Sequence, residues 1–231
     1  MMRALLFDLD DTLYAERQFV RSGFCVVAAE VEARFGVARR EAQATLVGAL
    51  RRGNRSRALQ ELCERHLLPV GIVPDLVDAI RAHTPSLRLP DSTVEVLRAA
   101  RGAGWRLGVV TNGFPAIQAR KIEALGLRDF VDTVVFAHEC GAGLGKPERA
   151  GFDAALAALG MPADLAVFVG DDPRCDVLGA RRAGMRTVWM RRGARSTGQV
   201  PGTAPDRVVT GMQDVLIAAE ALLATEVAHA A

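Results

Sequence analysis

Short apolar runs alternate with longer segments of helical periodicity over most of the chain. This alternation is typical of strand–helix units whose strands lie side by side in a parallel sheet. We expect strands at Ala4–Phe7, Arg106–Val110, Thr133–Phe136, Leu165–Val169, Arg186–Met190 and Arg207–Val209. We expect helices between and after them at Ser92–Ala103, Pro115–Leu125, Ala150–Leu159, Val177–Ala183 and Met212–Leu223. The pattern therefore predicts an α/β fold with a Rossmann-like, doubly wound parallel sheet.

Residues 14–89 break the alternation. They contain no strand candidate and read as four amphipathic helices, at about 16–35, 38–51, 55–67 and 74–83. A segment of this length is too long to be an ordinary connection between two strands. The sequence therefore predicts an α/β core made of 1–13 and 90–231, with an all-helical cap inserted at 14–89. The stretch 191–205, rich in glycine, arginine, serine and proline, is expected to be an exposed loop.

The composition describes a globular protein without a strongly charged partner. Half of the 231 residues are apolar, 24% are charged and the formal net charge is +2. This balance gives no electrostatic reason to expect binding to nucleic acid or to an anionic membrane. The longest apolar runs, such as Phe24–Ala29, are far shorter than a membrane span, and the N-terminus does not resemble a secretory signal. The four cysteines are scattered without a C-x-x-C pair, so we expect a reduced, cytoplasmic protein.

Polar residues follow several of the predicted strands at the point where each strand ends. The first strand ends in Asp-Leu-Asp at 8–10, the second in Thr-Asn-Gly at 111–113 and a later one in Gly-Asp-Asp at 170–172. Lys146 lies in the loop after the third predicted strand. Ligands of open parallel sheets bind at the carboxyl ends of the strands. We therefore expect these groups to meet at one edge.

The residue types at this edge indicate a metal and an anion. Asp8 and Asp10 are two apart on an extended segment and so face one side, and Asp171 arrives from another strand end. Such carboxylates repel one another unless a cation lies between them, and all-oxygen ligation favours magnesium over zinc. Lys146 and the Thr111 hydroxyl supply a charge and a donor for an anion. Together these groups suit a phosphoryl group.

The same residues resemble a known family. The segments DLDDT at 8–12, TNG at 111–113, KP at 146–147 and GDDPRCD at 170–176 resemble the four motifs of the haloacid dehalogenase superfamily, in the family's order. The longer stretches TNGFPAIQARKIEALGL and GDDPRCDVLGARRAGM are similar to the branch with a helical cap after the first strand. Pyrimidine 5′-nucleotidase-like and N-acylneuraminate-9-phosphatase-like members share that appearance.

The resemblance implies roles for the acids. Asp8 would attack phosphorus and form an aspartyl-phosphate, and Asp10 would act as general acid and then as general base. Magnesium would be held by the Asp8 carboxylate, the Asp10 main-chain carbonyl and Asp171, with Asp176 acting through water. Asp172 stands where serine or asparagine is frequent, so either Asp171 or Asp172 could be the direct ligand, and we favour Asp171.

The resemblance also implies the phosphate contacts. Thr111 and the Asn112 backbone would hold the phosphoryl oxygens, and Lys146 would neutralise the nucleophile and the transferred group. The chain departs from the family at 137–139, where Ala-His-Glu replaces the usual serine or threonine.

Of the 29 basic residues only two are lysines, Lys121 and Lys146, and we expect Lys121 on an exposed helix face.

The predicted function is that of a magnesium-dependent phosphatase for a small phosphorylated metabolite, of the nucleotide or sugar phosphate class. A phosphomutase is an alternative, and so is a catalytically silent phosphometabolite-binding protein. A dehalogenase is disfavoured because it needs neither Asp10 nor magnesium. The expected partner is a small phosphomonoester, and the sequence does not specify the oligomeric state. Possible cap contacts to the substrate are Arg17, Arg21, Asn54 and Arg57.

Overall fold

The computed structural model describes residues 2–191 and 204–227. Most of the expected exposed loop, residues 192–203, lies outside them. The chain divides into two compact units, one made of Met1–Ala15 and Arg88–Ala231 and the other of Glu16–Leu87. Within the described ranges, no helix is both long and apolar enough to cross a membrane.

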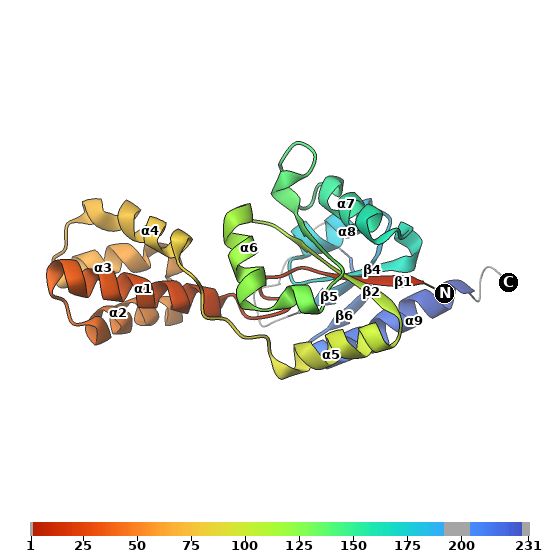
Figure 1. The fold of residues 1–231 in the computed structure, drawn as a ribbon, viewed down its shortest axis with the longest axis horizontal. Coiled ribbons are helices and arrows are strands. Elements are labelled where there is room, and N and C mark those ends of the chain that lie inside the picture. Colours follow the sequence, from red (N-terminus) through yellow and green to blue (C-terminus); the bar gives the residue numbers. More distant parts are fainter. Residues whose placement is uncertain (1, 192–203, 228–231) are drawn as a thin grey trace. The chain divides into compact units, whose positions relative to one another are not determined.

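The larger unit contains one sheet of parallel strands (Figure 1). The strands are ordered β3-β2-β1-β4-β5-β6, so the first strand of the chain lies in the middle. Their bounds are β1 Arg3–Phe7, β2 Trp105–Thr111, β3 Thr133–Phe136, β4 Ala166–Gly170, β5 Arg186–Met190 and β6 Arg207–Val209. Each predicted strand is confirmed to within a residue or so at either end, and the predicted fold class is confirmed with them.

Helices cover both faces of this sheet, with α5 and α9 on one side and α7 and α8 on the other (Figure 1). The helices of the unit are α5 Asp91–Gly102, α6 Pro115–Ala124, α7 Arg149–Leu159, α8 Leu178–Arg182 and α9 Val215–Val227. On the α7 side, Phe152 and Phe168 meet edge to face with ring centroids 4.9 Å apart. Because both faces are covered, the central strand is apolar from Ala4 to Phe7, and Leu5 and Leu6 are fully buried.

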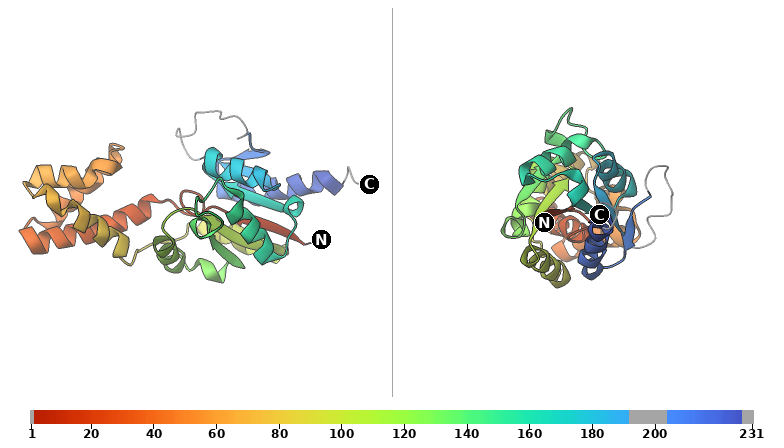
Figure 2. Two further views of the ribbon diagram at one scale, coloured as in Figure 1. Left: turned by 90° about the horizontal axis from the view of Figure 1, so that it is seen from above. Right: turned by 90° about the vertical axis from the view of Figure 1, so that its right-hand side faces the viewer.

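The smaller unit lies between β1 and α5 in the sequence and is all-helical (Figure 2). Its helices are α1 Arg17–Phe35, α2 Arg39–Arg51, α3 Ala58–His66 and α4 Val73–Ala82. They pack around their own apolar core, in which Val27, Leu46, Leu62 and Leu76 are fully buried. The amphipathic pattern of 14–89 thus forms four helices with a separate core. That this unit acts as a cap stays a prediction.

Strand register brings the ends of three strands together. Phe7 pairs with Val109 of β2 on one side and with Val169 of β4 on the other. The Asp8 amide continues this ladder by donating to the Val169 carbonyl at 2.9 Å. The polar residues that follow β1, β2 and β4 therefore emerge beside one another at one edge of the sheet.

Candidate active site

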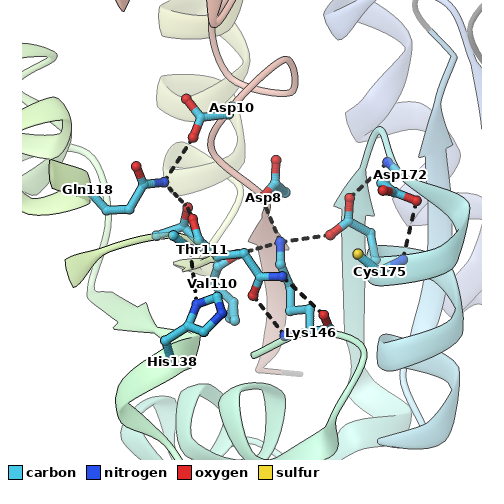
Figure 3. A network of polar contacts seen from close by, with 12 residues as sticks. Asp8, Asp10, Val110, Thr111, Gln118, His138, Lys146, Asp172 and Cys175 are labelled. Atoms are coloured by element: carbon cyan, nitrogen blue, oxygen red, sulfur yellow. Dashed lines mark hydrogen bonds and ion pairs between the residues drawn. The ribbon is translucent and has the colours of Figure 1, made fainter. Parts of the chain in front are cut away.

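Asp8 and Lys146 are the centre of the polar cluster at this edge (Figure 3). Asp8 directly follows β1 and is 7% exposed, and its Oδ1 accepts a hydrogen bond from Lys146 Nζ at 2.6 Å. The same Nζ donates to Asp176 Oδ1 at 2.7 Å and to the Val110 carbonyl at 3.0 Å. An ammonium has three protons, so each of them has an acceptor. The lysine is thereby fixed in one position between two carboxylates.

Burial and nearby negative charge raise the pKa of two acids of this cluster, Asp8 and Asp171. Burial raises the pKa of Asp8 to about 7, with Asp176 and Asp10 adding to the rise and Lys146 opposing it. Burial also raises the pKa of Asp171 to about 8, assisted by the neighbouring charges, Asp8 first among them. For Lys146, burial opposes the charged form, but Asp176 and Asp8 outweigh it and raise the pKa above its usual value. The cluster holds more negative charge than one lysine neutralises, and a divalent cation would relieve it.

The oxygen atoms needed for such a cation are close together. Carboxylate oxygens of Asp8, Asp171 and Asp176 all lie within 4.8 Å of one another. This set contains only oxygen ligands, which suits a hard divalent ion. The structure therefore brings together two of the three predicted metal ligands through their side chains, and adds Asp176, for which we expected only an indirect role. The Asp10 side chain is not part of this set; its main-chain carbonyl stays a predicted ligand.

Asp172 has a different local function from Asp171. The Asp172 Oδ1 accepts from the backbone amides of Arg174 and Cys175, at 2.8 and 3.3 Å. It thus caps the turn Pro173–Val177 that leads into α8. Of the two candidates left open by the sequence, Asp171 is the one whose carboxylate joins Asp8.

Gly170 makes room for the buried carboxylate of Asp176. A Cβ atom at Gly170 would lie 2.3 Å from the Asp176 carboxyl group. The Asp172 amide donates to Asp176 Oδ2 at 3.0 Å, while Asp176 Oδ1 accepts from Lys146. A side chain at position 170 would push Asp176 away from both donors, which explains glycine at the end of β4.

The Asn112 side chain holds the lysine loop rather than facing a ligand. Its Nδ2 donates to the Lys146 carbonyl at 3.0 Å, and its Oδ1 accepts from the Lys146 amide at 2.7 Å. His138, in the segment that departs from the family pattern, accepts at Nδ1 from the Gly113 amide at 3.0 Å. Gly145 has φ +71°, and a Cβ there would lie 2.7 Å from Asn112 Oδ1. These contacts link the segment after β2 to the loop that carries Lys146. The predicted phosphate contact of the Asn112 backbone stays a prediction.

The position of Lys121 contradicts the prediction that it lies on an exposed helix face. Instead of lying on an exposed face of α6, it is 4% exposed, and its Nζ is 2.8 Å from both carboxylate oxygens of Asp10. Two further donors reach the same carboxylate: the Tyr14 hydroxyl at 2.6 Å from Oδ1 and Gln118 Nε2 at 2.9 Å from Oδ2. The expectation failed because α6 turns a polar face, not an apolar one, toward the end of β1. The arginine-rich composition was the available signal, together with the i,i+3 spacing of Gln118 and Lys121 directly after the TNG segment.

Thr111 ends β2 beside this second ion pair. It is 1% exposed, and its Oγ1 accepts from Gln118 Nε2 at 2.6 Å and donates to the Asn112 carbonyl at 3.3 Å. Gln118 therefore contacts both Asp10 and Thr111 (Figure 3). All the residues predicted for the site lie at the carboxyl edge of the sheet, and their catalytic roles stay predictions.

The motifs and this geometry agree with a comparison against known families. A family model described as haloacid dehalogenase-like hydrolase matches residues 2–184. The chain belongs to this family.

Several relatives of the chain are named as phosphatases. The chain is similar to a phosphoserine phosphatase of Thermus thermophilus, 39% identical over 122 residues, and to the pyrimidine 5′-nucleotidase YjjG of Escherichia coli, 37% identical over 123 residues. Each of these matches covers 53% of this chain, and they cover 47% and 52% of those proteins, so the chain spans about half the length of these relatives. A glyceraldehyde 3-phosphate phosphatase of Methanopyrus kandleri is 33% identical over 211 residues, covering 84% of this chain and 85% of that protein. The resemblance to pyrimidine 5′-nucleotidases is thus confirmed.

Solved structures with the same fold include different activities. A HAD phosphatase from Thermococcus onnurineus has a TM-score of 0.59 at 24% identity, covering 93% of this chain and 96% of that one. A 2-haloacid dehalogenase from Pseudomonas syringae has a TM-score of 0.63 at 22% identity, covering 96% and 99%. These likenesses establish the fold, and the reaction has to be argued from the site.

Proposed function

We propose that this protein is a phosphoric monoester hydrolase that transfers the phosphoryl group of a small metabolite to Asp8 and then to water. The observation that carries the proposal is the position of Lys146 Nζ, 2.6 Å from Asp8 Oδ1, in a buried cluster with Asp171 and Asp176. A carboxylate nucleophile beside a fixed ammonium and a set of oxygen ligands suits attack on a phosphate dianion.

The first step would form an aspartyl-phosphate. An oxygen of Asp8 bonds to phosphorus as the bond from phosphorus to the leaving oxygen breaks, and the Asp10 carboxyl gives its proton to that oxygen. In the second step water bonds to the same phosphorus and gives one proton to Asp10, while the bond to Asp8 breaks. Inorganic phosphate leaves, and both acids return to their starting forms. The Thr111 hydroxyl and Lys146 would bind the phosphoryl oxygens through both steps.

The oxygen set fits magnesium, which we propose as the cofactor. Asp8, Asp171 and the Asp10 main-chain carbonyl would hold it, with Asp176 beside them. When bound, the ion would neutralise phosphoryl charge and the repulsion among the acids. The pKa of Asp171, raised to about 8 by burial and by the neighbouring carboxylates, supports this assignment because a bound cation would offset that negative charge.

The names of the relatives support the proposed substrate class. These relatives are named for phosphoserine, pyrimidine nucleotides and glyceraldehyde 3-phosphate, all small phosphorylated metabolites. We propose a phosphomonoester of this size as the partner, and the helical unit at 16–87 as the cap that selects it. A dehalogenase would have no use for the ion-paired Asp10 or for the acids around Lys146, so the phosphatase is favoured over it.

The test is release of phosphate from p-nitrophenyl phosphate, with magnesium and with chelator, by the unaltered protein and by Asp8→Asn. We expect turnover that needs magnesium and that Asp8→Asn reduces by at least about 1000-fold. Asp164→Asn is the matched control, because Asp164 is exposed and away from the cluster, and it should keep full activity. Full turnover by a folded Asp8→Asn protein would refute the proposed function.

A further inference from the structure

Both lysines of this chain pair with the acids that follow β1. Lys146 Nζ lies 2.6 Å from Asp8, and Lys121 Nζ lies 2.8 Å from both oxygens of Asp10. All the other basic residues of the chain are arginines. The ammonium on Asp8 belongs to the motifs of the family. The one on Asp10 comes from α6, and the proposed reaction above gives it no role.

The donors around Asp10 hold its carboxylate from several directions. Lys121 bridges both oxygens, the Tyr14 hydroxyl reaches Oδ1 at 2.6 Å and Gln118 Nε2 reaches Oδ2 at 2.9 Å. Gln118 and Lys121 are three residues apart on α6 and therefore lie on one face of that helix. A carboxylate whose two oxygens both accept hydrogen bonds cannot rotate freely about the Cβ–Cγ bond, so the orientation of the Asp10 carboxylate is fixed.

Gln118 extends the same contact to the predicted phosphate site. Its Nε2 is 2.6 Å from Thr111 Oγ1 as well as 2.9 Å from Asp10 Oδ2 (Figure 3). The Gln118 amide thus holds the Asp10 carboxyl group in a fixed position relative to the Thr111 hydroxyl. In the proposed reaction, Asp10 would carry the proton and Thr111 would bind the phosphoryl group. Such fixed spacing is what proton transfer in a reaction step requires.

The ion pair of Lys121 with Asp10 is largely shielded from solvent. The Lys121 side chain is 5% exposed, and that of Asp10 is 24% exposed. Burying an ammonium costs solvation, and removing one partner of such a pair leaves the other charge uncompensated. A substitution of Lys121 alone therefore has a stability cost, which has to be separated from any effect on the orientation of Asp10.

We propose that Lys121, supported by Gln118, is a positioning residue that orients the Asp10 carboxyl group toward the leaving oxygen. The inference rests on the proposed phosphatase function. It implies that without Lys121 the Asp10 carboxyl group is free to turn away from the leaving oxygen, so that its proton is delivered less often. The effect then depends on the ester, because a poor leaving group needs the proton, whereas p-nitrophenolate departs without it.

The experiment compares two esters with rings of similar size, p-nitrophenyl phosphate and benzyl phosphate. The kcat/KM of each is measured, since it reports the steps up to phosphoryl transfer to Asp8. For Lys121→Met we expect kcat/KM to fall by about 100-fold on benzyl phosphate and by less than about threefold on p-nitrophenyl phosphate. Lys121→Gln, which keeps a donor, should lose less on benzyl phosphate than Lys121→Met.

Two comparisons separate positioning from a general loss of structure. Arg120→Met removes a cation from the exposed side of the same helix and should leave both esters unchanged. In a protein that already carries Asp10→Asn, adding Lys121→Met should change kcat/KM on benzyl phosphate by less than about twofold, because coupled residues are not additive.

Several results would overturn the inference. These are an equal loss on both esters, a full additional loss on top of Asp10→Asn, or failure of both Lys121 variants to fold, which would make the lysine structural. The proposed function fails separately, through Asp8→Asn. If Asp8→Asn is inactive while Lys121→Met loses the same factor on both esters, the phosphatase stands and only the role of Lys121 is wrong.

Discussion

Lys146 and Asp176 form an ion pair in which Nζ lies 2.7 Å from Oδ1 and both side chains are only 2% exposed. The same ammonium is 2.6 Å from Asp8. One buried cation thus serves two buried carboxylates, one directly after β1 and the other in the turn that follows β4. This sharing makes Lys146 the residue on which the charge of the whole cluster depends.

Removing this cation should destabilise the fold. Lys146→Met leaves Asp8 and Asp176 buried without their partner, and we expect the free energy of unfolding to fall by about 3–5 kcal/mol. Urea unfolding at neutral pH in chelator measures it. Arg149→Met is the control, because its pair with Asp153 is exposed and should contribute at most about 1 kcal/mol. A loss from Lys146→Met no larger than that of the control would contradict the prediction.

Stability of the metal-free protein should depend on pH in an unusual direction. Because burial raises the pKa of Asp8 to about 7 and that of Asp171 to about 8 from the ordinary 3.8, the folded protein holds protons that the unfolded chain has released. The free energy of unfolding should therefore fall as pH rises from about 4 to about 8, and level off above that. Thermal unfolding in chelator across this range measures the slope. Asp171→Asn should flatten it, and an unchanged slope in that variant would count against the assignment.

The two adjacent acids after β4 should respond differently to substitution. Asp171→Asn removes a carboxylate from the oxygen set and is expected to abolish magnesium binding, measured by calorimetric titration. Asp172→Ala removes the cap of the turn Pro173–Val177 and should cost about 1 kcal/mol of stability with binding retained. The reverse pattern, with binding lost only in the Asp172 variant, would show that Asp172 is the direct ligand.

Gly145 should be needed for activity more than for folding. An alanine there meets both a φ of +71° and Asn112 Oδ1 at 2.7 Å, so the loop that carries Lys146 has to move. Gly160→Ala is the matched control, with φ +62° and no atom within 4 Å of its new Cβ. Both variants should lose about 1–2 kcal/mol from the left-handed backbone. Only Gly145→Ala should also lose phosphatase activity, and equal activity of the two would refute this reading of the loop.

The fold could be predicted because its signals are local. The strands in the middle of the sheet are short, mostly apolar runs such as Ala4–Phe7, because both faces of the sheet are covered. The helical unit could be predicted in the same way, because its sequence contains four amphipathic segments without a strand between them. The polar residues that follow β1, β2 and β4 could be placed together because parallel strands end at one edge.

The parts of the site that escaped prediction depend on where side chains turn. Asp171 was favoured over Asp172, but the carboxylate of Asp176 in the oxygen set was not expected, because the turn after β4 decides where these side chains point. Lys121 looked like a surface residue because charged residues on helices usually face water. The rotation of α6 relative to β1 decides otherwise, and the i,i+3 spacing of Gln118 and Lys121 was the local pattern that pointed to it.

The central position of β1 affects the order in which the molecule can form. Leu5 pairs with Leu107 and Val167, both more than a hundred residues further along the chain. Joining such distant segments costs loop-closure entropy, whereas α1–α4 contact one another within a single continuous stretch. During synthesis on a ribosome, α1–α4 are complete before β2 and β4 have been made. The core of the helical unit can therefore form while β1, with Asp8 at its end, still lacks both of the strands it pairs with.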